Sequence, residues 1–220
     1  MSIADNLKHI RTQIPANVTL VAVSKTKPNA DLLEAYRAGQ RDFGENYVQE
    51  LIQKQAELPG DIHWHFIGHL QSNKVKQIAP FVHLVHGVDS LKLLQEIDKQ
   101  AAKCQRIISF LLQIYIAKEE TKFGLSFDEC DALLKSEAYK SLTHVKLEGL
   151  MAMASFTANE TAITNEFKSL KSYADNLQAK GYNLPVLSFG MSGDYPLAIA
   201  CGSTLVRVGS AIFGQRQYVK

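Results

Sequence analysis

Strand-like and helix-like segments alternate along the whole sequence, and this alternation limits the chain to a small number of folds. Apolar runs and turn residues predict eight strands, over residues 18–25, 41–45, 63–67, 83–87, 106–116, 144–153, 186–190 and 204–208. Helices are predicted over residues 2–15, 29–38, 46–57, 72–79, 90–103 and 127–138, and the last between Thr157 and Gly181. Ser126 with Glu129, and Thr157 with Glu160, have the spacing of capping boxes.

This order of elements predicts an α/β fold. Alternating strands and helices build a parallel sheet that is covered by helices. The count of strands favours a closed (β/α)8 barrel, a TIM barrel, with an extra N-terminal helix, over an open doubly wound sheet. No linker rich in Pro, Gly or Ser divides the chain, so we expect a single domain over residues 1–220.

The composition is that of an ordinary globular protein, with 46% hydrophobic and 21% charged residues among 220. A net charge of +2 gives no basic field for nucleic acid, and no apolar run reaches membrane-spanning length. Residues 1–10 have neither the apolar core nor the cleavage site of a secretory leader. Cys104, Cys130 and Cys201 are odd in number and far apart, which predicts buried free thiols and a cytoplasmic protein.

Lys25 is the most unusual charge, because it ends a predicted buried strand. Residues 18–28 read Val-Thr-Leu-Val-Ala-Val-Ser-Lys-Thr-Lys-Pro. Alternation along a strand places Val21, Val23 and Lys25 on one face. An ammonium at the end of that face costs free energy to desolvate unless it has a partner or a chemical role. A lysine in such a setting can form an imine with a carbonyl compound.

Two glycine-containing stretches resemble a phosphate site. Residues 188–194 read Ser-Phe-Gly-Met-Ser-Gly-Asp and end the seventh strand, and Gly209 and Ser210 follow the eighth. Barrels often bind phosphate between these two loops, with backbone N–H groups directed at the anion. The alternative is that these glycines only form turns. Their joint occurrence at both expected strand ends favours the phosphate site.

Arg207 is the second unusual charge, within the apolar run Leu-Val-Arg-Val-Gly. Alternation places Leu205, Arg207 and Gly209 on one face. A permanently charged guanidinium in that position needs a partner. The sequence leaves two interpretations open: an ion pair with Glu45 or Asp194, or contact with a ligand's ring nitrogen or anion.

The histidines raise a metal hypothesis. His63 and His65 form a His-x-His pair on one predicted strand, with His69 close behind, and such pairs bind zinc in some barrel hydrolases. The other candidates lack distinctive spacing: His83, His86 and His144. His63 begins its strand, at the wrong end for a barrel active site. We therefore expect packing and hydrogen-bonding roles, and no metal.

Six segments spread along the chain resemble the YggS/PROSC family, the pyridoxal phosphate homeostasis proteins. They are residues 21–28, 43–50, 64–74, 149–153, 188–194 and 202–214. Among them are Val-Ala-Val-Ser-Lys-Thr-Lys-Pro, Trp-His-Phe-Ile-Gly-His-Leu-Gln-Ser-Asn-Lys and the strand that carries Arg207. The resemblance implies a barrel like the N-terminal domain of alanine racemase, which is fold type III of the pyridoxal 5′-phosphate (PLP) proteins.

The resemblance also implies roles for individual residues. Lys25 would hold PLP as a Schiff base, and Arg207 would face the pyridine nitrogen. The residues implied to hold the phosphate are Ser192, Gly209 and Ser210, and Asn46 would lie beside the ring. Further contacts are expected from Lys27, Lys122 and Met191.

Chemistry then favours a carrier over an enzyme. Arginine cannot accept a proton, so a ring nitrogen beside Arg207 stays unprotonated and the ring withdraws electrons weakly. Racemisation needs acid/base groups on both ring faces, and with six residues after Gly214 we expect no second domain that would supply one. We expect a cytoplasmic monomer that buffers PLP and delivers it to PLP-dependent apoenzymes. The alternatives are a weak PLP-dependent racemase or lyase and, further removed, a zinc-dependent barrel hydrolase.

Overall fold

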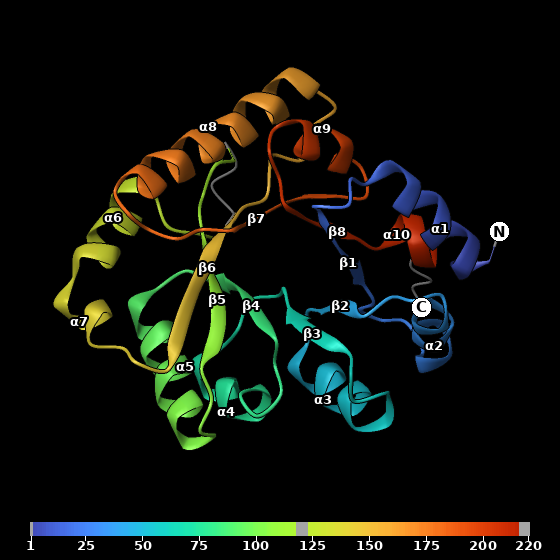
Figure 1. Cartoon of the computed structure of the whole chain (residues 1–220), viewed down its shortest axis with the longest axis horizontal. Coiled ribbons are helices and arrows are strands. Elements are labelled where there is room, and N and C mark those ends of the chain that lie inside the picture. The colour runs from blue at the N-terminus through green and yellow to red at the C-terminus, as the bar shows by residue number, and fades with distance from the viewer. Residues whose placement is uncertain (1, 118–122, 216–220) are drawn as a thin grey trace.

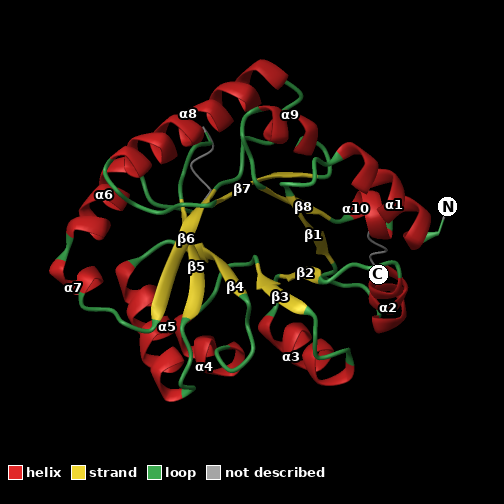
Figure 2. Ribbon diagram, viewed as in Figure 1, coloured by secondary structure: helices red, strands yellow, loops and turns green. Residues whose placement is uncertain are grey.

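The computed structural model describes residues 2–117 and 123–215. Eight parallel strands close into a barrel in the order β1 to β8, with helices around the outside (Figures 1 and 2). The strands are β1 Thr19–Val23, β2 Asp42–Glu45, β3 His63–Phe66, β4 Leu84–Val88, β5 Ile108–Gln113, β6 Val145–Met151, β7 Val186–Met191 and β8 Leu205–Val208.

Helix α1 precedes the first strand, and the other helices follow strands along the chain. The helices are α1 Ile3–Gln13, α2 Asn29–Arg37, α3 Val48–Glu57, α4 Val75–Ile78, α5 Leu91–Lys103, α6 Phe127–Lys135, α7 Glu137–Lys140, α8 Glu160–Ala179, α9 Tyr195–Ala200 and α10 Ser210–Phe213, with a 3-10 turn η1 over Ser72–Lys74. The extra N-terminal helix is confirmed: α1 starts at a capping box of Ser2 and Asp5 and packs against α2 and α10 (Figure 1).

Closure of the barrel depends on the pairing of its first and last strands. Thr19 pairs with Leu205 and Val21 with Arg207, in parallel register. An open doubly wound sheet has two unpaired edges, so this pairing confirms the TIM barrel. The register also places Arg207 beside Val21 of β1. Lys25 lies four residues further along the chain, and alternation puts it on the same face as Val21.

Side-chain alternation divides the strand residues between two cores. A small inner cluster fills the barrel and consists of Val21, Leu84, Leu111, Met151 and Leu205. The outward residues, such as Phe43, Phe66 and Phe110, pack against the helices in one large cluster. Burial of this outer layer drives association of helices with the sheet, whereas the inner face also accommodates polar groups.

Several predicted boundaries are wrong by a few residues. Strand β1 ends at Val23, so Lys25 lies beyond its last ladder residue. The helix predicted over 127–138 is divided at Ser136, whose side chain accepts from the Tyr139 N–H and caps α7. The capping box of Ser126 with Glu129 is confirmed at α6.

The start of α8 also differs from its prediction. The cap is Asn159, whose side chain accepts from the Ala162 N–H, and not Thr157. Thr157 instead accepts from the Asn159 N–H and shapes the preceding turn. Both residue types cap helices well, so the choice between them depends on the path of the chain into the helix.

The three thiols were expected to be free and buried, and only Cys130 is both. Cys130 is buried, and burial raises the pKa of its thiol to about 11, whereas Cys104 and Cys201 are partly exposed. All three are free cysteines. Within the two described ranges, no helix has the length and hydropathy to cross a bilayer.

Candidate functional site

One cavity of about 710 Å³ opens among the carboxyl ends of the barrel strands, where barrels carry their functional groups. Every predicted binding residue that the structure describes lines this cavity. They are Lys25, Lys27, Asn46, Met191, Ser192, Arg207, Gly209 and Ser210. Lys122 lies outside the described residues. Groups from the first two and the last two strands therefore share one space.

Lys25 lies two residues beyond the end of β1 and is half-buried at the cavity wall. The alternation of β1 continues through it, because Val21 lies inside the barrel and Val23 lines the cavity. Ser24 lies on the helix side instead, where its Oγ donates to Glu45 Oε1 at 2.6 Å. Lys25 therefore belongs to the cavity face although the strand ladder has ended.

The turn around Lys25 is held from helix α3. Thr26 has a φ of 64°, a left-handed conformation that is uncommon for a β-branched residue. Its N–H donates to Glu50 Oε1 at 2.6 Å, and Lys54 Nζ donates to the same oxygen at 2.6 Å and to the Ser24 carbonyl at 2.8 Å. Hydrogen bonds thus fix the backbone on both sides of Lys25, which orients its side chain.

A buried ion pair lies behind this turn. Lys54 Nζ is 2.8 Å from Glu45 Oε1, and the two side chains are 5% and 0% exposed. Burial raises the pKa of the Glu45 carboxyl, while Lys54 and Ser24 act in the opposite direction. We did not predict this pair from the sequence. The sequence indicates only the neighbouring pair of Lys54 with Glu50, because these two residues are one helical turn apart.

The two predicted anion loops are joined to each other. The Gly209 N–H donates to Ser192 Oγ at 3.1 Å, so the Ser192 hydroxyl hydrogen is left to donate elsewhere. Gly190 has a φ of 95°, and a Cβ there would lie 2.5 Å from Ala198 Cβ of helix α9. Only glycine allows this close approach, which places the loop over the start of α9.

Lys27, which the resemblance implies as a further cofactor contact, also has partners within the protein. Its Nζ donates to the carbonyls of Phe213 and Gln215, at 2.8 and 3.2 Å. Lys27 therefore stabilises the C-terminal end of α10, the short helix that Ser210 begins. It lines the cavity at the same time, so its charge still acts on an anion in that space.

Asn46 follows β2 and contributes an unsatisfied polar atom. Its Oδ1 is buried and has no hydrogen-bond partner among the described residues. A buried polar atom without a partner is costly, so a water or a bound group is expected to contact it. Because Asn46 lines the cavity, a ligand's polar substituent would satisfy it there.

Arg207 of β8 is 5% exposed, and it lines the cavity. Its Nη1 donates to Ser188 Oγ at 2.9 Å and to the Ser188 carbonyl at 3.2 Å, and its Nη2 donates to the Ala152 carbonyl at 3.0 Å. Burial lowers the pKa of Arg207 to about 10, against the opposing charge of Asp194, so it stays charged at neutral pH.

These bonds bear on one part of the ion-pair interpretation of Arg207. Glu45 is paired with Lys54, so the suggested ion pair of Arg207 with Glu45 is wrong. The three hydrogen bonds of Arg207 leave two of its five N–H groups without an acceptor among the described residues. A buried cation with free donors at a cavity wall is suited to a ligand acceptor.

The histidines inside the barrel form a hydrogen-bonded chain. His65 Nε2 is 3.0 Å from Asp42 Oδ1, and His65 Nδ1 is 3.0 Å from His86 Nε2. His86 Nδ1 is 3.1 Å from Ser188 Oγ, the same oxygen that Arg207 contacts. Strands β4 and β7 are not neighbours, so the contact between His86 and Ser188 crosses the barrel interior. Sequence reasoning missed this chain, although it favoured hydrogen-bonding roles.

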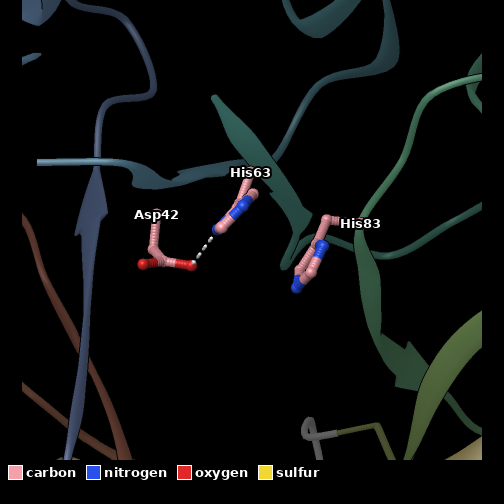
Figure 3. Close-up of side chains that lie close together, drawn as sticks. All are labelled: Asp42, His63 and His83. Atoms are coloured by element: carbon pink, nitrogen blue, oxygen red, sulfur yellow. Dashed lines mark hydrogen bonds and ion pairs between the residues drawn. The ribbon is translucent and has the colours of Figure 1, made fainter. Parts of the chain in front are cut away.

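The other mouth of the barrel holds a group that resembles a metal site. Asp42, His63 and His83 each offer one ligand atom, and these atoms lie within 4.8 Å of one another (Figure 3). The rings of His63 and His83 are stacked, with centroids 4.5 Å apart and planes at 17°. Imidazoles bind metals along in-plane lone pairs, and two nearly parallel stacked rings do not direct theirs at one point. His65 bonds Asp42 and His86 instead, so this geometry gives the zinc hypothesis no support.

Comparison with known proteins identifies the family. The family described as "Alanine racemase, N-terminal domain" matches residues 1–217, and the chain belongs to this family of barrel domains. A pyridoxal phosphate homeostasis protein of Pseudomonas aeruginosa is 41% identical, over 99% of this chain and 97% of that protein. The protein of that name from Schizosaccharomyces pombe is 40% identical, over 94% and 90%. These relatives confirm the resemblance to the homeostasis proteins.

Solved structures agree with this assignment. PipY of Synechococcus elongatus, 39% identical, matches with a TM-score of 0.91 without PLP and 0.88 with PLP bound, over 97% of this chain and 100% of PipY. Alanine racemase of Clostridium difficile matches with a TM-score of 0.77 at 15% identity, over 99% of this chain and 57% of the racemase. The racemase shares the barrel fold, and the chain spans somewhat more than half of its length.

Proposed function

We propose that this protein binds PLP at Lys25, buffers the reactive aldehyde and delivers it to PLP-dependent apoenzymes. The observation that carries the proposal is the single cavity that holds the Lys25 amine, the free N–H groups of Arg207 and the two joined loops. The names of the relatives support it, as does PipY with PLP bound.

The residues fit the cofactor at each of its polar parts. Bound PLP supplies an aldehyde carbon and an electron-withdrawing ring. Lys25 reacts with that carbon through its unprotonated amine, with loss of water. The Ser192 hydroxyl and Ser210 offer donors to the phosphate, and the Asn46 amide, whose Oδ1 has no partner among the described residues, offers a contact to the ring.

Arg207 favours a carrier over an enzyme. A guanidinium with a pKa of about 10 donates hydrogen bonds and has no lone pair to accept a proton. Facing the ring nitrogen, it keeps that nitrogen unprotonated, so carbanion chemistry gains little help from the ring. Exchange of one amine for another at the aldehyde carbon needs no such help, and this exchange is what delivery requires.

We further propose that the protein acts as a monomer in the cytoplasm. The partly exposed thiols Cys104 and Cys201 are compatible with a reducing compartment, where PLP-dependent apoenzymes are also synthesised. Analytical ultracentrifugation tests the monomer directly, with 24.5 kDa as the expected mass. A stable dimer at micromolar concentration would contradict this part of the proposal.

A visible spectrum of the purified protein with PLP tests the proposed function. We expect a yellow protein whose long-wavelength band is absent in Lys25→Ala and unchanged in Lys76→Ala, which alters an exposed lysine of α4. We also expect no sustained turnover of D- or L-alanine, and transfer of PLP that restores activity to an added apoenzyme. Sustained racemisation would favour the enzyme alternative. If the unsubstituted protein stayed colourless with PLP, this result would contradict PLP binding at Lys25.

A further inference from the structure

The hydrogen-bonded chain of side chains between Asp42 and Arg207 contains three buried residues that the proposed function does not use. His86 and Ser188 are completely buried, and His65 is 2% exposed. They link Arg207 at the cofactor cavity to Asp42, the first residue of β2 at the opposite end of the barrel. Buried polar side chains are costly unless each is satisfied, so a complete chain of this length indicates a role.

The hydrogen-bonding capacities of these groups fix a direction along the chain. An ionised carboxylate only accepts, so His65 Nε2 carries a hydrogen and donates to Asp42. With its hydrogen on Nε2, His65 accepts at Nδ1 from His86 Nε2–H, and His86 then accepts at Nδ1 from the Ser188 hydroxyl. Ser188 Oγ finally accepts from Arg207 Nη1. Each group therefore donates its hydrogen bond to the next group in the direction from Arg207 to Asp42.

Two other arrangements satisfy the same contacts with an ionised Asp42, and both are less favourable because each adds a buried cation. In the first, doubly protonated His86 would donate to both His65 Nδ1 and Ser188 Oγ. In the second, doubly protonated His65 would donate from both nitrogens, which reverses the hydrogen bond to His86 and the one from His86 to Ser188. Burial is the largest of the causes that hold the pKa of His86 well below 6.5, and burial likewise makes a second cation beside Arg207 costly.

We propose that His65, His86 and Ser188 are positioning residues, which relay the Nη1 hydrogen bond of Arg207 to the Asp42 carboxylate and so fix which guanidinium N–H groups face the cofactor. The inference rests on the proposed function, in which Arg207 contacts the ring nitrogen. Polarised hydrogen bonds in a chain strengthen one another, so the distant carboxylate stabilises the buried guanidinium without an ion pair at the cavity. Arg207 then keeps N–H groups available for the ligand at the cavity wall.

Substitution of Ser188 tests the relay through PLP affinity. Ser188→Ala removes the Oγ that joins Arg207 to His86 but leaves the carbonyl contacts of Arg207. We expect PLP to bind the full-length protein about tenfold more weakly, since a hydrogen bond to a charged group is lost, with a shifted visible band. Ser203→Ala is the matched control, because Ser203 is also buried but donates only to backbone carbonyls. It should change PLP affinity less than twofold.

A double-mutant cycle separates positioning from general support of the barrel. In an Arg207→Gln background, Ser188→Ala should change PLP affinity less than twofold, because the residue that Ser188 positions is gone. An equal loss in both backgrounds would overturn the inference, as would full affinity in Ser188→Ala. If the unsubstituted protein itself fails to bind PLP, the proposed function fails instead.

Nitrogen NMR of the unsubstituted protein tests the chain without any mutation or cofactor. With 15N-labelled histidine near neutral pH, we expect His65 and His86 to be neutral tautomers that carry their hydrogen on Nε2. His86 protonated on Nδ1 would show the reverse direction and overturn the inference. This readout depends on neither PLP binding nor the folding of a variant.

Discussion

Lys54 shows at the scale of one residue how a lysine that does not line the cavity supports it. Its ammonium pairs with Glu45 and Glu50 while its side chain is 5% exposed. Lys54→Met would leave the Glu45 carboxylate buried without a countercharge, so we expect a loss of about 3–5 kcal/mol of unfolding free energy. Urea denaturation measures this. In Lys99→Met, an exposed pair with Glu96 is lost, and the change should stay below about 1 kcal/mol. Equal losses would contradict the structural role of Lys54.

His86 predicts a pH dependence of stability. Its pKa in the folded protein lies well below the ordinary value of 6.5, chiefly because of burial. Below pH 6.5 the unfolded chain takes up a proton that the folded chain does not, so acidification favours unfolding. This residue should contribute a slope of about 1.4 kcal/mol per pH unit as pH falls below that value.

Denaturation curves between pH 7.5 and 5 give the measurement for His86 as a difference between variants. The slope should be shallower by that amount in His86→Gln and unchanged in His9→Gln, which alters an exposed histidine of α1. Parallel curves for the unsubstituted protein and His86→Gln would show that His86 titrates normally in the folded state.

At the scale of the elements, β6 and β7 meet closely at Gly149. Gly149 pairs with Val186, and a Cβ on Gly149 would lie 1.7 Å from the Val186 carbonyl oxygen. Gly149→Ala therefore forces the two strands apart, and we expect a loss of more than about 4 kcal/mol or an insoluble protein. Gly60→Ala, where no atom lies within 4 Å, should change stability by less than about 0.5 kcal/mol. If the Gly149→Ala protein were stable, this result would contradict the close approach of β6 and β7 at Gly149.

The eight strands and their order were predictable, because strand-like and helix-like segments alternate between turn residues along the whole sequence. Their ends were less so: β1 stops at Val23, since the Lys25 turn is held by Lys54 and Glu50 of another element. Lys25 and Arg207 were predictable as charges in apolar strands. The chain through His86 and Ser188 joins residues 102 positions apart on strands that are not neighbours, and no spacing in the sequence indicates it.

At the scale of the whole molecule, ligand binding and stability are linked. PLP at about one hundred times its dissociation constant should stabilise the fold by about 2.7 kcal/mol. For a domain of this size, the melting temperature then rises by about 5–10 °C. Pyridoxal, which lacks the phosphate, should raise it by less than half as much if the loops of Ser192 and Ser210 hold the anion. Equal shifts for the two compounds would place the phosphate outside these loops.

The covalent bond at Lys25 is the central claim, and borohydride reduction followed by peptide mass mapping tests it most directly. Reduction of the PLP-loaded protein makes the bond permanent, and we predict one modified peptide, with the pyridoxyl phosphate group on Lys25. A label found on another lysine, or no label in a protein that is yellow before reduction, would contradict the account.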